Sequence, residues 1–231
     1  MAFKKFRADQ LFDGTRLRDD QSVLITSEAG VVEEIISLQD AGDDIQVMDG
    51  ILTPGFVNCH CHLELSHMKG LIPEHTGLTH FLAQVMKGRH VQESVILEAI
   101  EAAETSMLKE GIVAVGDICN TTNTLLQKAK RRIWYHNFIE AMGFQPELAD
   151  ARFQRTVEIF TAFASQYITP VASISIVPHA PYSVSNKLWK RILSFPGNQL
   201  LTIHNQEAKD ENELFLDKTG GFLSFYENSK I

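Results

Sequence analysis

Cysteine is scarce in this sequence, with three residues among 231, and two of the three are separated by a single residue. Cys59, Cys61 and Cys119 cannot build a disulfide framework, so we expect a reducing compartment. The N-terminus lacks the apolar core of a signal peptide, and no run approaches the about 18 apolar residues that can span a bilayer. These absences predict a cytoplasmic protein with no membrane partner.

Positive charge is also in short supply. Lysine and arginine number 21 against 29 aspartates and glutamates, which gives a formal net charge of −8. Such a surface repels a phosphate backbone, so we expect no nucleic-acid partner. The densest basic run, residues 128–132, is interpreted as the solvated end of a helix. Apolar residues make up 44% of the chain, which is enough to bury a substantial globular core.

The chain contains two regions with different patterns. Residues 1–53 hold short apolar runs separated by acidic turns, which indicates part of a small β domain. In residues 54–231, apolar strands alternate with amphipathic helices, as is typical of a parallel α/β sheet or barrel. We expect five strands, at residues 51–62, 112–119, 133–141, 171–177 and 199–204. A closed barrel has eight such units, so the expected fold is an incomplete (β/α)8 barrel of about five units.

Residues 58–62, NCHCH, place four potential zinc ligands within five positions. Side chains alternate along a strand, so His60 and His62 share one face while Cys59 and Cys61 share the other. At the carboxyl end of a barrel strand the two imidazoles could reach one cation, and the cysteines would pack against helices. An isolated pair of this kind is more often two ordinary polar residues. A zinc knuckle would need a second cysteine pair, and only Cys119 remains.

Two further histidines end expected strands. His179 follows the fourth strand and His204 ends the fifth, so three of the five strands finish in histidine at the edge where a barrel performs its chemistry. The other histidines are expected on the surface or in loops: His67, His75, His80, His90 and His136. Three carboxylates near strand ends are expected to make structural hydrogen bonds or to cap loops: Glu64, Asp117 and Glu140.

The phrase ILTPGFVNCHCH at residues 51–62, with PHAPYSVS around His179 and IHNQE after it, resembles the amidohydrolase superfamily. Within it the match is to the mononuclear branch of cytosine and guanine deaminases, triazine chlorohydrolases and adenosine-type deaminases. The stretch HCHLELSHMKG is most similar to the aminodeoxyfutalosine deaminase-like members. In this family the N-terminal β segment belongs to a composite β-sandwich, which the resemblance implies for residues 1–53.

The resemblance also implies roles for individual residues. His60, His62 and His204 would bind one divalent ion, zinc in preference to iron, Glu207 would move protons between water and substrate, and His179 would contact the substrate. The implied reaction is hydrolytic deamination of an aminated purine- or pyrimidine-type ring or nucleoside, a small-molecule substrate, by a metal-activated water. No lysine ends the fourth strand to bridge two metals. A dinuclear amide or ester hydrolase is the alternative within this class.

The sequence departs from the family pattern in its later part. The family has a histidine after the sixth strand and an aspartate after the eighth, and neither has a counterpart here. We therefore expect these 231 residues to look truncated, with partial metal occupancy and little activity alone. The open sheet edge could pair with a second copy or another chain. The alternative from a different class is a degenerate fragment that serves only as an interaction module.

Overall fold

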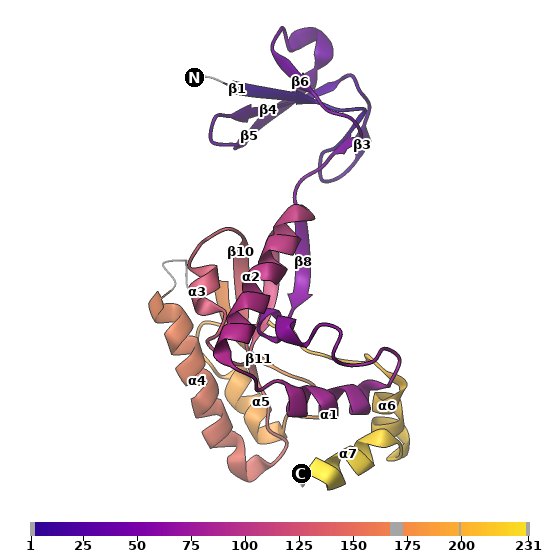
Figure 1. Cartoon of the computed structure of the whole chain (residues 1–231), viewed down its shortest axis with the longest axis vertical. Helices are drawn as coiled ribbons and strands as arrows, with labels where there is room; N and C mark the ends of the chain where they lie inside the picture. Colours follow the sequence, from indigo (N-terminus) through magenta and orange to yellow (C-terminus); the bar gives the residue numbers. More distant parts are fainter. Residues whose placement is uncertain (1–2, 167–172, 199, 230–231) are drawn as a thin grey trace. The chain divides into compact units, whose positions relative to one another are not determined.

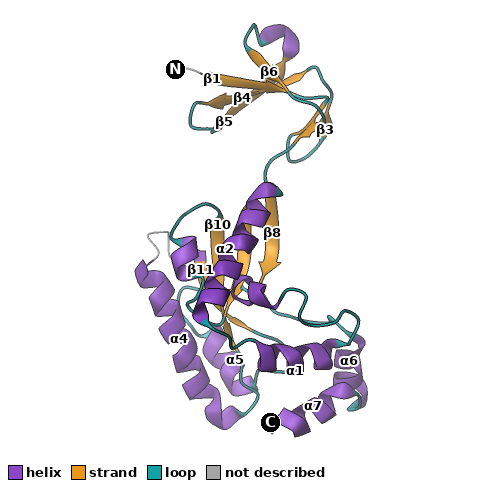
Figure 2. Cartoon of the chain, viewed as in Figure 1, coloured by secondary structure: helices purple, strands orange, loops and turns teal. Residues whose placement is uncertain are grey.

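The computed structural model describes residues 3–166, 173–198 and 200–229. Its backbone contacts divide the chain into two compact units, Met1–Phe56 and Val57–Ile231. The first unit consists of strands and turns with one short 3-10 helix, and the second alternates strands with helices (Figure 2). No described helix is both long enough and apolar enough to cross a membrane.

The first unit contains two small sheets. One has the strand order β5-β4-β1-β6, with β1 at Phe3–Arg7, β4 at Ser22–Ser27, β5 at Val32–Ser37 and β6 at Ile45–Val47. The other has the order β3-β2-β7, with β2 at Gln10–Phe12, β3 at Leu17–Arg18 and β7 at Ile51–Leu52. Val23 and Leu11 are buried, one in each sheet, so this unit has apolar contacts of its own.

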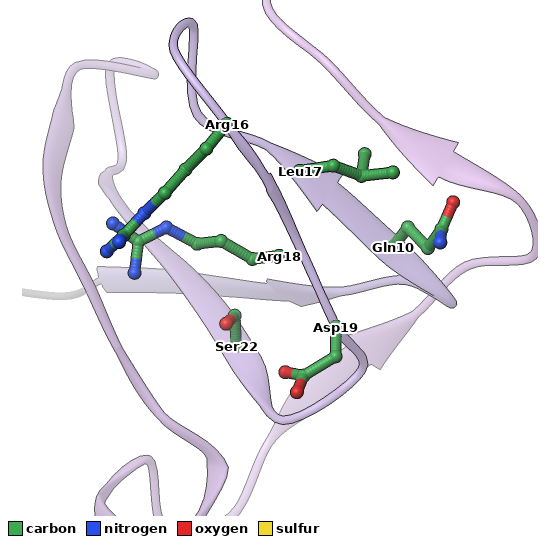
Figure 3. Close-up of a pocket in the computed structure, with 6 residues that line it drawn as sticks. All are labelled: Gln10, Arg16, Leu17, Arg18, Asp19 and Ser22. Atoms are coloured by element: carbon green, nitrogen blue, oxygen red, sulfur yellow. The ribbon is translucent and has the colours of Figure 1, made fainter.

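A shallow polar pocket lies on this first unit (Figure 3), lined by Gln10, Arg16, Leu17, Arg18, Asp19 and Ser22. The Arg18 guanidinium donates to Asp13 at 2.7 Å, and Arg16 lies 3.6 Å from the same carboxylate. Hydrogen bonds from Thr15, Arg16 and Arg18 hold the pKa of Asp13 well below its usual range. Both arginines therefore have an acidic partner, and the pocket does not concentrate positive charge.

The second unit is organised around a four-stranded sheet in the order β11-β10-β9-β8. Its strands are β8 at Phe56–Cys61, β9 at Ile112–Cys119, β10 at Trp134–Ala141 and β11 at Ile174–Pro178. β10 is parallel to both β9 and β11, which confirms the expected parallel sheet. A methyl group at Gly116 would lie 2.7 Å from the carbonyl oxygen of Cys59, so this glycine lets β8 approach β9 closely.

Helices cover the sheet and follow its strands (Figure 1). They are α1 at Leu78–Gly88, α2 at Glu93–Lys109, α3 at Leu125–Lys128, α4 at Ala149–Gln166, α5 at Asn186–Leu193, α6 at Lys209–Asn212 and α7 at Gly221–Ser229. A π-helix, Glu213–Asp217, continues α6. Ile139 and Ile176 of the sheet pack against Phe163 of α4 and Leu188 of α5, all buried, and so form the main apolar core.

The fifth strand, expected at residues 199–204, does not form where the structure describes it, from 200 onward. The side-chain amide of Asn198 instead accepts a hydrogen bond from the backbone N–H of Ile176 and donates to its carbonyl, both at 2.9 Å. Farther along, the His204 N–H donates to the His179 carbonyl at 2.8 Å. The Asn198 side chain thus occupies backbone groups at the edge of β11 that a neighbouring strand would use for its hydrogen bonds. Residues 200–204 therefore form no strand beside β11.

Two predictions about polar residues are wrong. Residues 129–132 follow helix α3 and are exposed, as expected for a solvated helix end, but Lys128 is fully buried. Its ammonium donates to Asp117 and, at 2.8 Å, to Asn137. His136, expected on the surface or in a loop, lies buried in β10 with Nε2 3.1 Å from the Ser175 hydroxyl. In both cases an internal hydrogen-bonding partner replaces water, which allows a polar group to be buried.

Candidate metal centre

The NCHCH stretch occupies the carboxyl end of β8. Cys61 is partly buried against the apolar cluster that contains Leu63 and Ile100, and burial raises the pKa of its thiol to about 12. Cys59 is exposed, because β8 is the outer strand of the described sheet, so the expectation that both cysteines pack against helices is only half met. The two histidines lie near a third, His204, which comes from the segment after β11.

His60, His62 and His204 form a compact cluster. Each offers a ring nitrogen, and these three nitrogens lie within 4.8 Å of one another. The Nε2 atoms of His62 and His204 are 3.3 Å apart, and the rings of His60 and His204 have centroids 4.7 Å apart. The buried Nδ1 of His62 finds no hydrogen-bond partner among the described residues. Three converging imidazoles are a ligand set suited to a divalent ion such as zinc, so the residues present fit a metal.

The charges of this cluster are unequal. Burial lowers the pKa of His62 to about 4 and also lowers the pKa of His60. Burial acts in the same direction on His204, but hydrogen bonds with Glu140 and Glu207 outweigh it and raise the pKa of His204 to about 9. At neutral pH, the rings of His60 and His62 are therefore neutral and the ring of His204 is protonated. A metal ion that binds His204 would have to displace its proton.

A second set of potential ligands lies beside His204. Glu140, buried at the end of β10, has Oε1 3.5 Å from the His204 Nε2, and His179 completes a group with ligand atoms within 4.8 Å. Burial by itself raises the pKa of Glu140, but the hydrogen bond with His204 and the nearby charge of the histidines hold it at about 2. Glu140 also makes the structural hydrogen bond expected for it, because it accepts from the side-chain amide of Asn120 at 3.0 Å. Its place beside His204 is not expected from the sequence, in which the carboxyl end of a strand is the one signal for it.

His179 follows β11, as expected, and has its ring centroid 5.1 Å from that of His204. Its Nδ1 contacts the Ser183 hydroxyl at 2.5 Å, and burial lowers its pKa. A neutral imidazole with one nitrogen engaged by a hydroxyl has a fixed orientation, so the other nitrogen is available to a ligand.

Glu207 lies at the exposed side of the cluster. Its carboxylate oxygen is 2.6 Å from the His204 Nδ1, and its side chain is 38% exposed. An open pocket adjoins it, lined by Glu207, Ala208, residues 72–78 and Phe81. The structure thus brings all five sequence-predicted residues of the site into one neighbourhood, with Glu207 at the solvent side.

Two of the remaining acids make structural hydrogen bonds, as expected. Glu64 is buried and accepts from the backbone N–H groups of Asn120 and Thr121 at 3.0 and 2.8 Å. Asp117 accepts from the Leu63 N–H at 2.8 Å and so fixes the turn that follows His62.

Of the other histidines, three are exposed as expected, His75, His80 and His90. His67 is partly buried, and neither ring nitrogen has a partner among the described residues.

Comparisons with known proteins identify the family. Residues 51–229 match the amidohydrolase family, so this chain belongs to it. The chain is 27% identical over 184 residues to the aminodeoxyfutalosine deaminase of a Nitratiruptor species, covering 77% of this chain and 44% of that protein. The family is generally metal-dependent, in agreement with the ligand set.

Two solved structures show the same fold. The Helicobacter pylori aminofutalosine deaminase in complex with methylthio-coformycin superposes with a TM-score of 0.77 at 21% identity, covering 97% of this chain and 56% of that one. A Xanthomonas campestris adenosine deaminase with bound Zn gives a TM-score of 0.65 at 16% identity, covering 97% and 54%. The chain thus spans about half the length of the relatives that it matches.

Proposed function

We propose that this chain supplies metal ligands and the proton-transfer group of an amidohydrolase that deaminates the adenine-type ring of a nucleoside. The observation that carries the proposal is the convergence of His60, His62 and His204, with the Glu207 carboxylate on the last of these rings. The similar proteins are an aminodeoxyfutalosine deaminase, an aminofutalosine deaminase and an adenosine deaminase, which supports a nucleoside as the substrate. The overall reaction replaces a ring amino group with a carbonyl oxygen from water and releases ammonia.

In this proposal the three histidines hold a single zinc ion. When bound, such an ion acts as a Lewis acid that lowers the pKa of water from 15.7 to about 7. The alternative set of Glu140, His179 and His204 does not add a second ion, because Nε2 of His204 faces both His62 and Glu140. A ring nitrogen coordinates one ion at a time, so the two sets of ligands cannot both be occupied. We therefore expect one zinc per chain, where a dinuclear amide or ester hydrolase would hold two.

Glu207 is the proposed general acid and base. Its carboxylate accepts one proton from the attacking water and delivers it to the ring nitrogen next to the amino-bearing carbon. It then takes the second proton, from the hydroxyl now on that carbon, and passes it to the amino group, so that the C–N bond breaks, ammonia leaves and a carbonyl remains. Its exposed side faces the open pocket, so the same carboxylate can reach a ligand while touching His204. The free ring nitrogen of His179 orients the substrate through a hydrogen bond.

The test is ammonia release from adenosine and aminodeoxyfutalosine by the zinc-loaded natural polypeptide that contains these residues. We expect Glu207→Gln to keep its zinc and to lose at least about 100-fold in turnover, the scale of general acid and base catalysis. Glu147→Gln, at an exposed position away from the cluster, is the matched control and should resemble the unsubstituted protein. Normal turnover by the Glu207 variant would refute the assigned role, and zinc binding without ammonia release would refute the substrate class.

A further inference from the structure

The turn that carries Glu207 leads into helix α6 (Figure 1). A buried carboxylate from this helix holds the turn. Glu211, 2% exposed, accepts hydrogen bonds from three successive backbone N–H groups. The donors are Gln206 to Oε2 at 3.1 Å, Glu207 to Oε1 at 2.6 Å, and Ala208 to Oε1 at 3.4 Å. Hydrogen bonds to a carboxylate are stronger than those between neutral groups, so this side chain is a firm support for the turn.

The backbone of the turn requires such support. Gln206 has φ of 56°, in the left-handed region that residues other than glycine adopt at a cost. Upstream, the His204 N–H is bound to the His179 carbonyl at 2.8 Å, just past the end of β11. Residues 204–208 are therefore fixed at their first residue by the hydrogen bond beside the sheet and at their last three residues by Glu211.

The position of the turn determines where the Glu207 carboxylate lies. This carboxylate meets the His204 Nδ1 at 2.6 Å, and a shift of the Glu207 backbone would move it away from that ring. We infer that Glu211 is a positioning residue for Glu207: it fixes the 206–208 turn so that the proton-transfer carboxylate stays against His204. This inference rests on the proposed function of Glu207. The hydrogen bonds of Glu211 to the turn can nevertheless be tested without measuring activity.

Amide hydrogen exchange on the 231-residue chain tests these hydrogen bonds directly. We expect protected amides at residues 206–208, and in Glu211→Gln about tenfold faster exchange there, because an amide side chain offers one acceptor oxygen in place of two charged ones. Glu213→Gln is the matched control, since the Glu213 carboxylate pairs with Lys209 at 2.7 Å. It should leave the three amides unchanged. Open-chain exchange rates in the unsubstituted protein, or unchanged rates in Glu211→Gln, would overturn the inference.

Kinetics of the zinc-loaded natural polypeptide separate positioning from a general structural role. Misplacement of a catalytic group by about 1 Å can cost about 100-fold, so we expect kcat to fall about 10- to 100-fold in Glu211→Gln. The KM should stay within about threefold, because the lost contacts act on the transition state and not on substrate binding. Zinc affinity should fall by no more than the about 10- to 100-fold of a lost outer-shell contact, because the three histidines remain, and complete loss of zinc binding in this variant would overturn the inference. Absence of deamination by the unsubstituted protein would refute the proposed function, while the exchange experiment would still decide the role of Glu211.

Discussion

The Nε2 atoms of His62 and His204 lie 3.3 Å apart, although 142 residues separate them in the sequence. The first follows β8 and the second lies beyond β11, at the opposite edge of the described sheet. The strands β9, β10 and β11 run parallel, so their carboxyl ends open on the same side of the sheet, and His62 meets His204 from the end of β8. This single contact joins the two sequence regions on which the proposed metal centre depends.

The first prediction concerns this contact. His62→Asn removes one of three converging imidazoles, so zinc affinity should fall by more than the about 10- to 100-fold expected for an outer-shell contact. Isothermal titration of zinc into the metal-free chain measures the change. His75→Asn, at a fully solvated position, is the control and should bind zinc as the unsubstituted chain does. Equal affinities for the two variants would rule out His62 as a ligand.

The second prediction is a pH dependence of zinc binding. The pKa of His204 is raised to about 9 while that of His62 is lowered to about 4, so near neutral pH only the His204 ring must lose a proton to bind zinc. Between about pH 7 and 9 the affinity should therefore rise about tenfold per pH unit, and it should level off above 9. Titrations in buffers of different ionisation enthalpy should show about one proton released per zinc. A flat affinity profile across this window would contradict the proposed protonation state.

The third prediction concerns the buried pair of Lys128 and Asp117. Both side chains are fully buried, so Lys128→Met leaves an unpaired carboxylate inside the protein and should cost about 3–5 kcal/mol of unfolding free energy. Lys130→Met is the matched control, because Lys130 pairs with Glu101 at the surface, where such a pair contributes about 0–1 kcal/mol. Urea unfolding followed by tryptophan fluorescence compares them. Similar losses in the two variants would mean that the buried pair is not formed in solution.

The fourth prediction concerns the contact between β8 and β9. A methyl group in Gly116→Ala would lie 2.7 Å from the Cys59 carbonyl oxygen and 3.0 Å from the Phe138 ring, so β8 must shift. We expect a loss of about 1–3 kcal/mol in unfolding free energy, as for other overpacked sites, together with weaker zinc binding through the neighbouring His60. In the control Gly143→Ala the methyl group would lie 3.0 Å from Cγ of the exposed Arg152 and 3.4 Å from Leu188, with no backbone atom as close, so a smaller loss and unchanged zinc binding are expected. Full stability of Gly116→Ala would show that the strands can separate without cost.

Periodicity predicted most of the second unit. The strands β9, β10 and β11 lie where the apolar runs placed them, because their side chains are buried in the apolar core of this unit. The strand expected at 199–204 shows the limit of this reasoning. Its apolar sequence fits a strand, but strand pairing also depends on which groups reach the neighbouring edge, and the Asn198 side chain reaches it.

Burial of polar groups was the other limit. A basic run is usually solvated, yet Lys128 is enclosed because Asp117 and Asn137 supply its partners from two strands. In the same way, the sequence showed Glu140 at a strand end but not its distance from His204. Partners of this kind are distant in the chain, so no local pattern reveals them.

The sequence by itself determined the ligand types, the alternation that separates His60 and His62 from Cys61, and the motifs that relate the chain to the amidohydrolase family. The tertiary structure alone decided which of these residues meet, that Glu140 faces His204, and that Glu211 holds the turn of Glu207. The physical reason is that residue type and strand period are local properties of a chain. The distances and protonation states of a site arise from groups that only the packed sheet brings together.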